Sequence, residues 1–208
     1  TKLSAFCLTE GSLEFTARTQ VPTTVEDIEY GFNNARRLLE RNGVEICSDP
    51  VVLSTSSAAG GLRMVALGYM PRVTAKAAKE VSMSAGARVL EIISHEDQPE
   101  YRIQILQEIK PDIILLAGGT DGGDQDSLIE NAQNIVKSGV KATVIIAGNK
   151  DAQPKAEAIL REKGIPSIRV PNVMPTIHEL KVKPAREAIH RQFIQQITVA
   201  KGLNKLMD

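Results

Sequence analysis

A regular alternation of apolar runs and amphipathic stretches dominates the sequence from residue 51 onward and limits the folds open to it. The apolar runs are short and rich in Val, Ile and Leu, as strands are. Continuous runs of this kind are typical of strands buried on both faces of a parallel sheet that helices cover. The runs lie at residues 51–55, 62–68, 88–94, 112–117, 142–147 and 167–170.

Amphipathic stretches separate the later runs and predict helices. Glycine or proline residues punctuate the series, and a strand is expected after each of them. Successive strand–helix units predict an open, doubly wound, mainly parallel α/β sheet with helices on both faces and right-handed crossovers. The predicted helices lie near residues 73–85, 99–109, 126–138 and 152–163.

Two shorter segments flank the predicted sheet. Residues 2–8 and 13–19 alternate weakly around T-E-G-S, which predicts a β-hairpin. A helix is expected after it, with Thr24 as a cap, Glu26 and Asp27 near its positive end, and Asn42-Gly43 at its close.

The tail predicts one long amphipathic helix from about residue 184 to 201, with Pro184 in its first turn. We therefore expect three parts. Residues 1–50 would form a hairpin and a helix as a partial lobe, residues 51–180 the doubly wound domain, and residues 181–208 a helix that packs back.

Composition argues against several classes of partner. Lys+Arg and Asp+Glu number 25 each, so no net field attracts nucleic acid or an anionic membrane. No apolar stretch approaches the roughly 20 residues that span a bilayer. Cys7 and Cys47 are too few and too far apart for a disulfide framework, so we interpret both as reduced thiols of a cytoplasmic protein.

Polar turns follow four of the predicted strands, at residues 54–61, 117–124, 147–151 and 171–175, and the first three contain glycine. Open α/β sheets bind ligands beyond the carboxyl ends of their strands, so these turns predict a ligand site. The serines and glycines of S-T-S-S-A-A-G-G suggest an anion-binding nest. The candidate ligand-binding residues are Ser56, Ser57, Gly60, Gly61, Gly118, Gly119, Thr120, Asp121, Gly122, Gly123, Asp124, Asn149 and Asn172.

The carboxylates of A-G-G-T-D-G-G-D complicate a phosphate site. Two like charges at 4 Å repel by about 4 kcal/mol at an effective dielectric near 20. Asp121 and Asp124 would therefore oppose a phosphate unless Mg²⁺ intervened, reached by these carboxylates through its water shell. They are otherwise expected to accept bonds from ribose-like hydroxyls. A structural alternative is that Asp124 or Asp126 only caps the next helix, and that Asp151 caps the one after it.

Common catalytic signatures are absent from the sequence. G-x-S-x-G, G-x-x-x-x-G-K-[ST] and G-x-G-x-x-G do not occur, and the three histidines lack metal-ligand spacing. No catalytic residue is assigned, and the residues alone predict an α/β domain with a glycine-rich ligand crevice.

Several blocks of the sequence nevertheless resemble one family. It is the GlmL/MutL family associated with glutamate (methylaspartate) mutase and related adenosylcobalamin-dependent mutases, which is unrelated to the mismatch-repair protein of the same name. The resemblance covers essentially the whole chain. It rests on S-S-A-A-G-G-L-R-M-V-A-L-G, P-D-I-I-L-L-A-G-G-T-D-G-G-D, I-I-A-G-N, P-N-V-M-P, T-T-V-E-D-I-E-Y-G-F-N-N-A and K-P-A-R-E-A-I-H-R-Q-F-I.

The resemblance implies an accessory, chaperone-type ATPase of the actin-like superfamily. Such a protein would use ATP and Mg²⁺ to reactivate a mutase by exchanging damaged cobalamin, with the mutase subunits as its partners. Family members carry their phosphate loops just before the pair matching Thr1-Lys2 and beyond the region matching Gly202. The sequence is therefore expected to be an N-terminal fragment that does not hydrolyse ATP by itself.

Two other functions stay open at this point. The doubly wound domain is alternatively a small-ligand module that holds a nucleotide or part of a cobalamin at residues 118–124, without catalysis. An independent α/β enzyme is the third interpretation.

Overall fold

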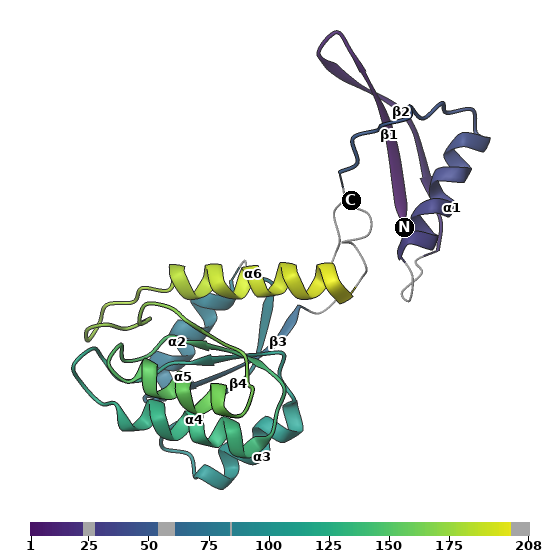
Figure 1. Ribbon diagram of the computed structural model, residues 1–208. Coiled ribbons are helices and arrows are strands. Elements are labelled where there is room, and N and C mark those ends of the chain that lie inside the picture. The colour runs from purple at the N-terminus through teal and green to yellow at the C-terminus, as the bar shows by residue number, and fades with distance from the viewer. Residues whose placement is uncertain (23–27, 54–60, 84, 201–208) are drawn as a thin grey trace. The chain divides into compact units, whose positions relative to one another are not determined.

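The computed structural model describes residues 1–22, 28–53, 61–83 and 85–200. The chain divides into two compact units (Figure 1). One comprises Thr1–Ser57 with Gln195–Asp208, and the other comprises Ala58–Ile194. Each unit is described by itself.

The first unit contains the predicted hairpin. Strands β1 (Lys2–Thr9) and β2 (Ser12–Gln20) pair antiparallel, and Glu10 and Gly11 turn the chain with positive φ angles of 48° and 87°. Helix α1 (Ile28–Arg41) follows, and the Thr19 hydroxyl donates to the Ala35 carbonyl at 3.0 Å. The helix start expected at Thr24, Glu26 and Asp27 lies outside the described residues.

The second unit contains a five-stranded, wholly parallel sheet, as the sequence predicts. Its spatial order is β4-β3-β5-β6-β7, so the second strand along the chain lies at an edge and the first lies inside. The strands are β3 (Leu62–Gly68), β4 (Ala87–Ser94), β5 (Ile113–Leu116), β6 (Thr143–Ile146) and β7 (Ser167–Arg169).

Alternate side chains of the strands enter two cores, because successive residues of a strand point to opposite faces. Met64 and Leu115 belong to one core, and Val65 and Leu116 belong to the other. The first core receives helices α2 (Pro71–Ser82) and α6 (Lys183–Ala200). The second receives α3 (Pro99–Ile109), α4 (Asp126–Ser138) and α5 (Gln153–Glu162) (Figure 1). The predicted doubly wound α/β class is therefore confirmed.

Helix α6 packs on the sheet through the side chains of Ala185, Ala188 and Ile189, all of which are buried. The Arg186 guanidinium donates to the Glu80 carbonyl of α2 at 2.9 and 3.2 Å. These contacts fix the first turns of the long C-terminal helix against the domain.

The prediction of a strand at residues 51–55 is wrong for the part that the structure describes. Residues 51–53 form no strand, and the side chains of Val51 and Leu53 are 89% and 92% exposed. None of the five sheet strands pairs with these residues, and an apolar run without a neighbouring strand has nothing to satisfy its backbone as a strand. Residues 54 and 55 lie outside the described residues.

The strand order defines one special position in this sheet. From β3 the chain crosses to β4 on one side, and from β4 it returns to β5 on the other side of β3. Connections leave the carboxyl ends of β3 and β5 in opposite directions, which opens a crevice between them in folds of this type.

Candidate functional site

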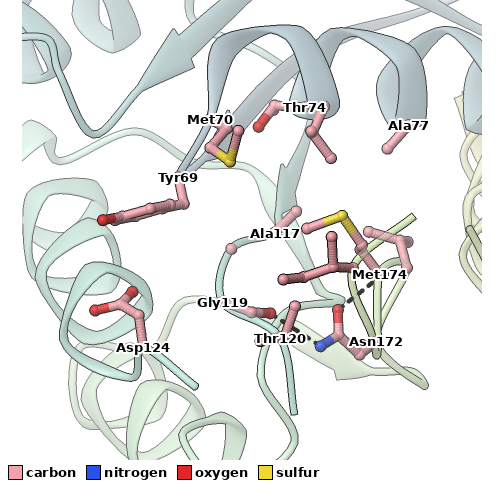
Figure 2. A pocket seen from close by; sticks show the side chains of 14 residues that line it. Tyr69, Met70, Thr74, Ala77, Ala117, Gly119, Thr120, Asp124, Asn172 and Met174 are labelled. Carbon is pink, nitrogen blue, oxygen red and sulfur yellow. Dashed lines mark hydrogen bonds between the residues drawn. The ribbon is translucent and has the colours of Figure 1, made fainter. Parts of the chain in front are cut away.

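A cavity of about 230 Å³ lies at this reversal point, beyond the carboxyl ends of β3 and β5 (Figure 2). The turn after β3 supplies Tyr69 and Met70, and α2 supplies Val73. The turn after β5 supplies Gly118 and Gly119. The cavity therefore occupies the position at which the sequence predicts a ligand site.

Nonpolar side chains form most of the cavity wall. The segment after β7 contributes Met174 and Ile177, and α2 contributes Val73 and Ala77. Ile177 is 73% exposed, so the cavity wall includes a solvent-exposed nonpolar side chain. The polar side chains that line it are Thr74, Thr120, Asp124 and Asn172.

The glycine-rich loop after β5 needs glycine where its backbone approaches itself. Gly119 has φ +69°, and a Cβ there would lie 2.0 Å from the Asp124 carbonyl oxygen. Gly122 also has a positive φ of +75°, but a Cβ there would meet open space. The first glycine is therefore required by close packing and the second only by its backbone conformation.

Asp121 joins three turns of the sheet edge. One of its carboxylate oxygens, Oδ1, accepts from the Lys150 backbone N–H at 3.0 Å and from Asn172 Nδ2 at 2.9 Å. Its own backbone N–H donates to the Pro175 carbonyl at 2.9 Å. Asp121 is not among the cavity-lining residues, and its carboxylate stabilises the turns that form the cavity.

The side-chain amides of two buried asparagines complete this support. Asn149 Nδ2 donates to the carbonyls of Thr120, Gly123 and Asp124 at 2.7, 3.2 and 3.1 Å. Asn172 Nδ2 also donates to the Gly119 carbonyl at 3.0 Å. Both amides therefore hold the backbone of the glycine-rich loop in place.

Asp124 is exposed and lines the cavity. Its Oδ2 accepts a hydrogen bond from the Ser127 hydroxyl in the first turn of α4. The N-cap of α4 is Gln125 and carries no side-chain cap bond, so the prediction that Asp124 or Asp126 caps this helix is wrong. The physical reason is that the Asp124 carboxylate engages a hydroxyl and not the backbone N–H groups.

The cap predicted at Asp151 is also wrong. Helix α5 has Ala152 as its N-cap, without a side-chain cap bond. The Asp151 backbone N–H instead donates to Asn149 Oδ1 at 2.8 Å, which closes a turn one residue earlier.

The described cavity residues do not fit a magnesium-bound phosphate. None of them is Lys, Arg or His, so no cationic side chain of the cavity would balance the charge of a phosphate. Among the described residues no group of three or more His, Cys, Asp or Glu is placed to hold a metal ion. The water-mediated Mg²⁺ contact of Asp121 and Asp124 stays a prediction.

The other predicted site residues fall into three groups. Thr120 lines the cavity, while Gly122 and Gly123 lie exposed in the same loop. Gly61 directly precedes the amino end of β3, whereas the cavity lies beyond the carboxyl end of that strand. Ser56, Ser57 and Gly60 lie outside the described residues.

Sequence reasoning missed the nonpolar lining residues Tyr69, Met70 and Val73. The available signal was the turn Y-M-P, which directly follows the strand run at residues 62–68 and begins the next helix. It lacks glycine and polar residues after the strand, so it did not match the pattern sought in a ligand-binding turn.

Tyr69 contacts the turn that follows β4. Its ring stacks on His95 with centroids 5.6 Å apart. The His95 carbonyl accepts from Arg102 Nη2 at 2.9 Å, and Arg102 is only 2% exposed. The buried Arg102 guanidinium therefore stabilises one wall of the cavity indirectly, through His95.

The segment after β7 also carries a local ion pair. Lys181 Nζ lies 3.0 Å from Glu179 Oε1, and the Thr176 hydroxyl donates to Glu179 Oε2 at 2.9 Å. The hydrogen bond from Lys181 and then that from Thr176 hold the pKa of Glu179 below its ordinary value.

Together these features define a doubly wound α/β domain with a mainly nonpolar cavity at its strand-order reversal. The chain belongs to the MutL family: the family model described as MutL protein matches residues 1–208. Over 205 residues the chain is 40% identical to the Protein MutL of Clostridium tetanomorphum. The alignment covers 98% of this chain and 44% of that protein, so the chain spans less than half of the relative's length.

Two solved structures show weaker similarity. One is the signal receiver domain of the response regulator NarL from Mycobacterium tuberculosis, with a TM-score of 0.40, 13% identity, and coverage of 65% of this chain and 95% of that chain. The other is the receiver domain of a modulated diguanylate cyclase from Desulfovibrio desulfuricans G20, with a TM-score of 0.39, 14% identity, and coverage of 66% and 98%. Nothing about function follows from either likeness. No helix in the described part of the chain is long and apolar enough to cross a membrane.

Proposed function

We propose that the chain is part of an accessory protein that reactivates an adenosylcobalamin-dependent mutase, such as glutamate mutase, by direct contact with the mutase subunits. The observation that carries this proposal is the family membership across residues 1–208, together with 40% identity to the clostridial Protein MutL. The intact protein is proposed to bind ATP with Mg²⁺ and to act in the cytoplasm.

The hydrogen bonds of the glycine-rich loop favour a structural role for this loop in such a protein. Asp121, Asn149 and Asn172 direct their side chains at the backbone of neighbouring turns. The loop thus stabilises the domain edge, and the residues that would grip ATP are proposed to lie elsewhere in the intact protein.

An exposed apolar face on the hairpin supports a function in protein contact. Phe6 pairs with Phe15, and Leu8 pairs with Leu13, so the four side chains share one face. They are 56–70% exposed, and the two rings meet edge to face at 5.7 Å. Clustered exposed apolar side chains mark contact surfaces, and we propose a mutase subunit as the partner of this face.

The test is size-exclusion and pull-down analysis of the intact protein with its mutase, with ATP and Mg²⁺, with ADP, and without nucleotide. We expect association that depends on the nucleotide, and recovery of activity by an inactivated mutase when ATP is present. Absence of association in every nucleotide state, together with no recovery, would overturn the accessory function.

A second comparison tests the hairpin face separately. The double variant Leu8→Ser with Leu13→Ser should weaken the association, whereas Glu10→Ser in the turn of the same hairpin should leave it unchanged. If the double variant and the Glu10→Ser variant bind the mutase equally well, the hairpin face is not the contact. The accessory function is then still tested by the first experiment.

A further inference from the structure

The cavity between the carboxyl ends of β3 and β5 has a composition that selects for one kind of ligand. Its wall is mostly nonpolar, which favours burial of a nonpolar molecular body. Tyr69 contributes an aromatic ring, and Met70 and Met174 contribute thioethers. Rings and thioethers pack well against flat aromatic groups.

The shape of the cavity is set before any ligand arrives. Figure 2 shows Met70 and Thr74 on the helix side, and Gly119 and Thr120 on the loop side. The loop side is held by the Asn172 bond to the Gly119 carbonyl at 3.0 Å and by the Asn149 bond to the Thr120 carbonyl at 2.7 Å. A preformed site loses little free energy to ordering when it binds.

Asp124 determines the charge that the cavity prefers. It is the only carboxylate among the described lining residues, and none of those residues is Lys, Arg or His. The hydrogen bond given for its carboxylate uses Oδ2, with Ser127 as the donor, so Oδ1 is available to a ligand. A carboxylate beside a nonpolar wall attracts hydroxyl or ammonium donors and repels phosphates and carboxylates.

We propose that this cavity binds the flat, nonpolar part of a small neutral or cationic molecule, whose hydroxyl or ammonium group donates a hydrogen bond to Asp124. This inference is independent of the accessory function, because it concerns one cavity within residues 58–194. The proposed site also differs from a phosphate-binding crevice, since the Asp124 carboxylate repels anionic ligands.

Three probes that share one ring and differ in charge test the proposal: benzylamine, benzyl alcohol and benzoate. Binding to the 208-residue chain is followed by the amide chemical shifts of Tyr69 and Gly118 in NMR titrations. Benzylamine should bind more tightly than benzyl alcohol by about two- to fivefold, the range for a solvent-exposed ion pair. Benzoate should bind most weakly.

Two variants locate the effect. Asp124→Asn should abolish the preference for the amine while benzyl alcohol still binds, whereas Asp126→Asn, a neighbouring exposed carboxylate outside the cavity lining, should preserve it. Val73→Trp should fill the cavity and remove binding of all three probes, with an otherwise unchanged amide spectrum as the check on folding.

Three outcomes would overturn the proposal. They are benzoate binding as tightly as benzylamine, an amine preference that survives Asp124→Asn, and titrations in which no probe shifts the amides around the cavity.

Discussion

The carboxylate of Asp121 accepts a hydrogen bond from the side-chain amide of Asn172 at 2.9 Å, although 51 residues separate them in the sequence. The same carboxylate oxygen accepts from the Lys150 backbone N–H at 3.0 Å. Three consecutive turns at the carboxyl edge of the sheet are thereby tied together. The edge that forms the cavity is thus stabilised by a side chain that does not line it.

Replacing Asp121 should therefore affect stability. Asp121→Ala removes the acceptor of two hydrogen bonds to a charged group, and we expect a loss of about 1–3 kcal/mol in the free energy of unfolding. Asp151→Ala is the matched control, because Asp151 is exposed in the neighbouring turn, and its change should stay within about 0.5 kcal/mol. Urea denaturation of both variants measures the difference, and equal losses would contradict the role given to Asp121.

Two glycines of one loop separate backbone strain from steric conflict. Gly122→Ala should cost about 1–2 kcal/mol, the penalty for a left-handed residue with a Cβ, because the added methyl group meets open space. Gly119→Ala should reduce the free energy of unfolding by about 1–3 kcal/mol more than Gly122→Ala, since its Cβ would lie 2.0 Å from the Asp124 carbonyl oxygen. Thermal and urea unfolding measure both, and similar losses at the two positions would contradict the close approach.

Arg102 should be the most sensitive polar position described in the second unit. Its guanidinium is 2% exposed and donates to the Asp97 and His95 carbonyls at 2.8 and 2.9 Å and to Asn131 Oδ1 at 2.9 Å. Arg102→Ala leaves one buried and two half-buried acceptors without this donor, and we expect a loss of about 3 kcal/mol or more. Arg102→Lys should recover little of it, because one ammonium group cannot reproduce the planar fork.

The control for Arg102 is Arg169→Ala on the edge strand β7. Arg169 pairs with Glu157 at 3.1 Å, but its side chain is 47% exposed. An exposed ion pair of this kind contributes about 0–1 kcal/mol. Urea denaturation at constant pH compares the variants, and a loss at Arg102 no larger than that at Arg169 would show that the buried bonds are weak.

The fold followed from the sequence where a pattern repeats, because burial on both sheet faces leaves its mark in every strand. The runs at residues 62–68 and 88–94 coincide with β3 and β4 almost to the residue. The run at residues 51–53 failed because pairing needs a neighbouring strand, and periodicity carries no information about neighbours.

The candidate site was predictable in position but not in chemistry. The glycine-rich loop indicated the end of the sheet at which the cavity lies, because the crevice of folds of this class opens beyond the carboxyl ends of the strands. The direction of each carboxylate depends on contacts between distant residues: Asp121 faces Asn172 and Lys150, whereas Asp124 lines the cavity. Strand order decides which turns meet, and the sequence does not state it.

The ion pair beside the cavity gives a prediction about pH. The hydrogen bond from Lys181 lowers the pKa of Glu179 below 4.5 in the folded protein. A lowered folded-state pKa stabilises the protein above the unfolded pKa, and this contribution is lost as pH falls through the folded value. Lys181→Ala should therefore raise the pKa of Glu179 toward 4.5, and the variant should differ from wild type in stability at neutral pH but not in strong acid.

Carbon-detected NMR titration of the Glu179 carboxyl group measures this pKa, and urea denaturation across the same pH range measures the linked stability. Lys183→Ala is the matched control, because Lys183 pairs with Glu187 at 3.9 Å and does not contact Glu179. That variant should leave the Glu179 pKa where wild type has it. An unchanged pKa in Lys181→Ala would mean that Lys181 does not set the Glu179 pKa. An equal rise in both variants would mean that the general field of the lysines, and not the hydrogen bond, sets it.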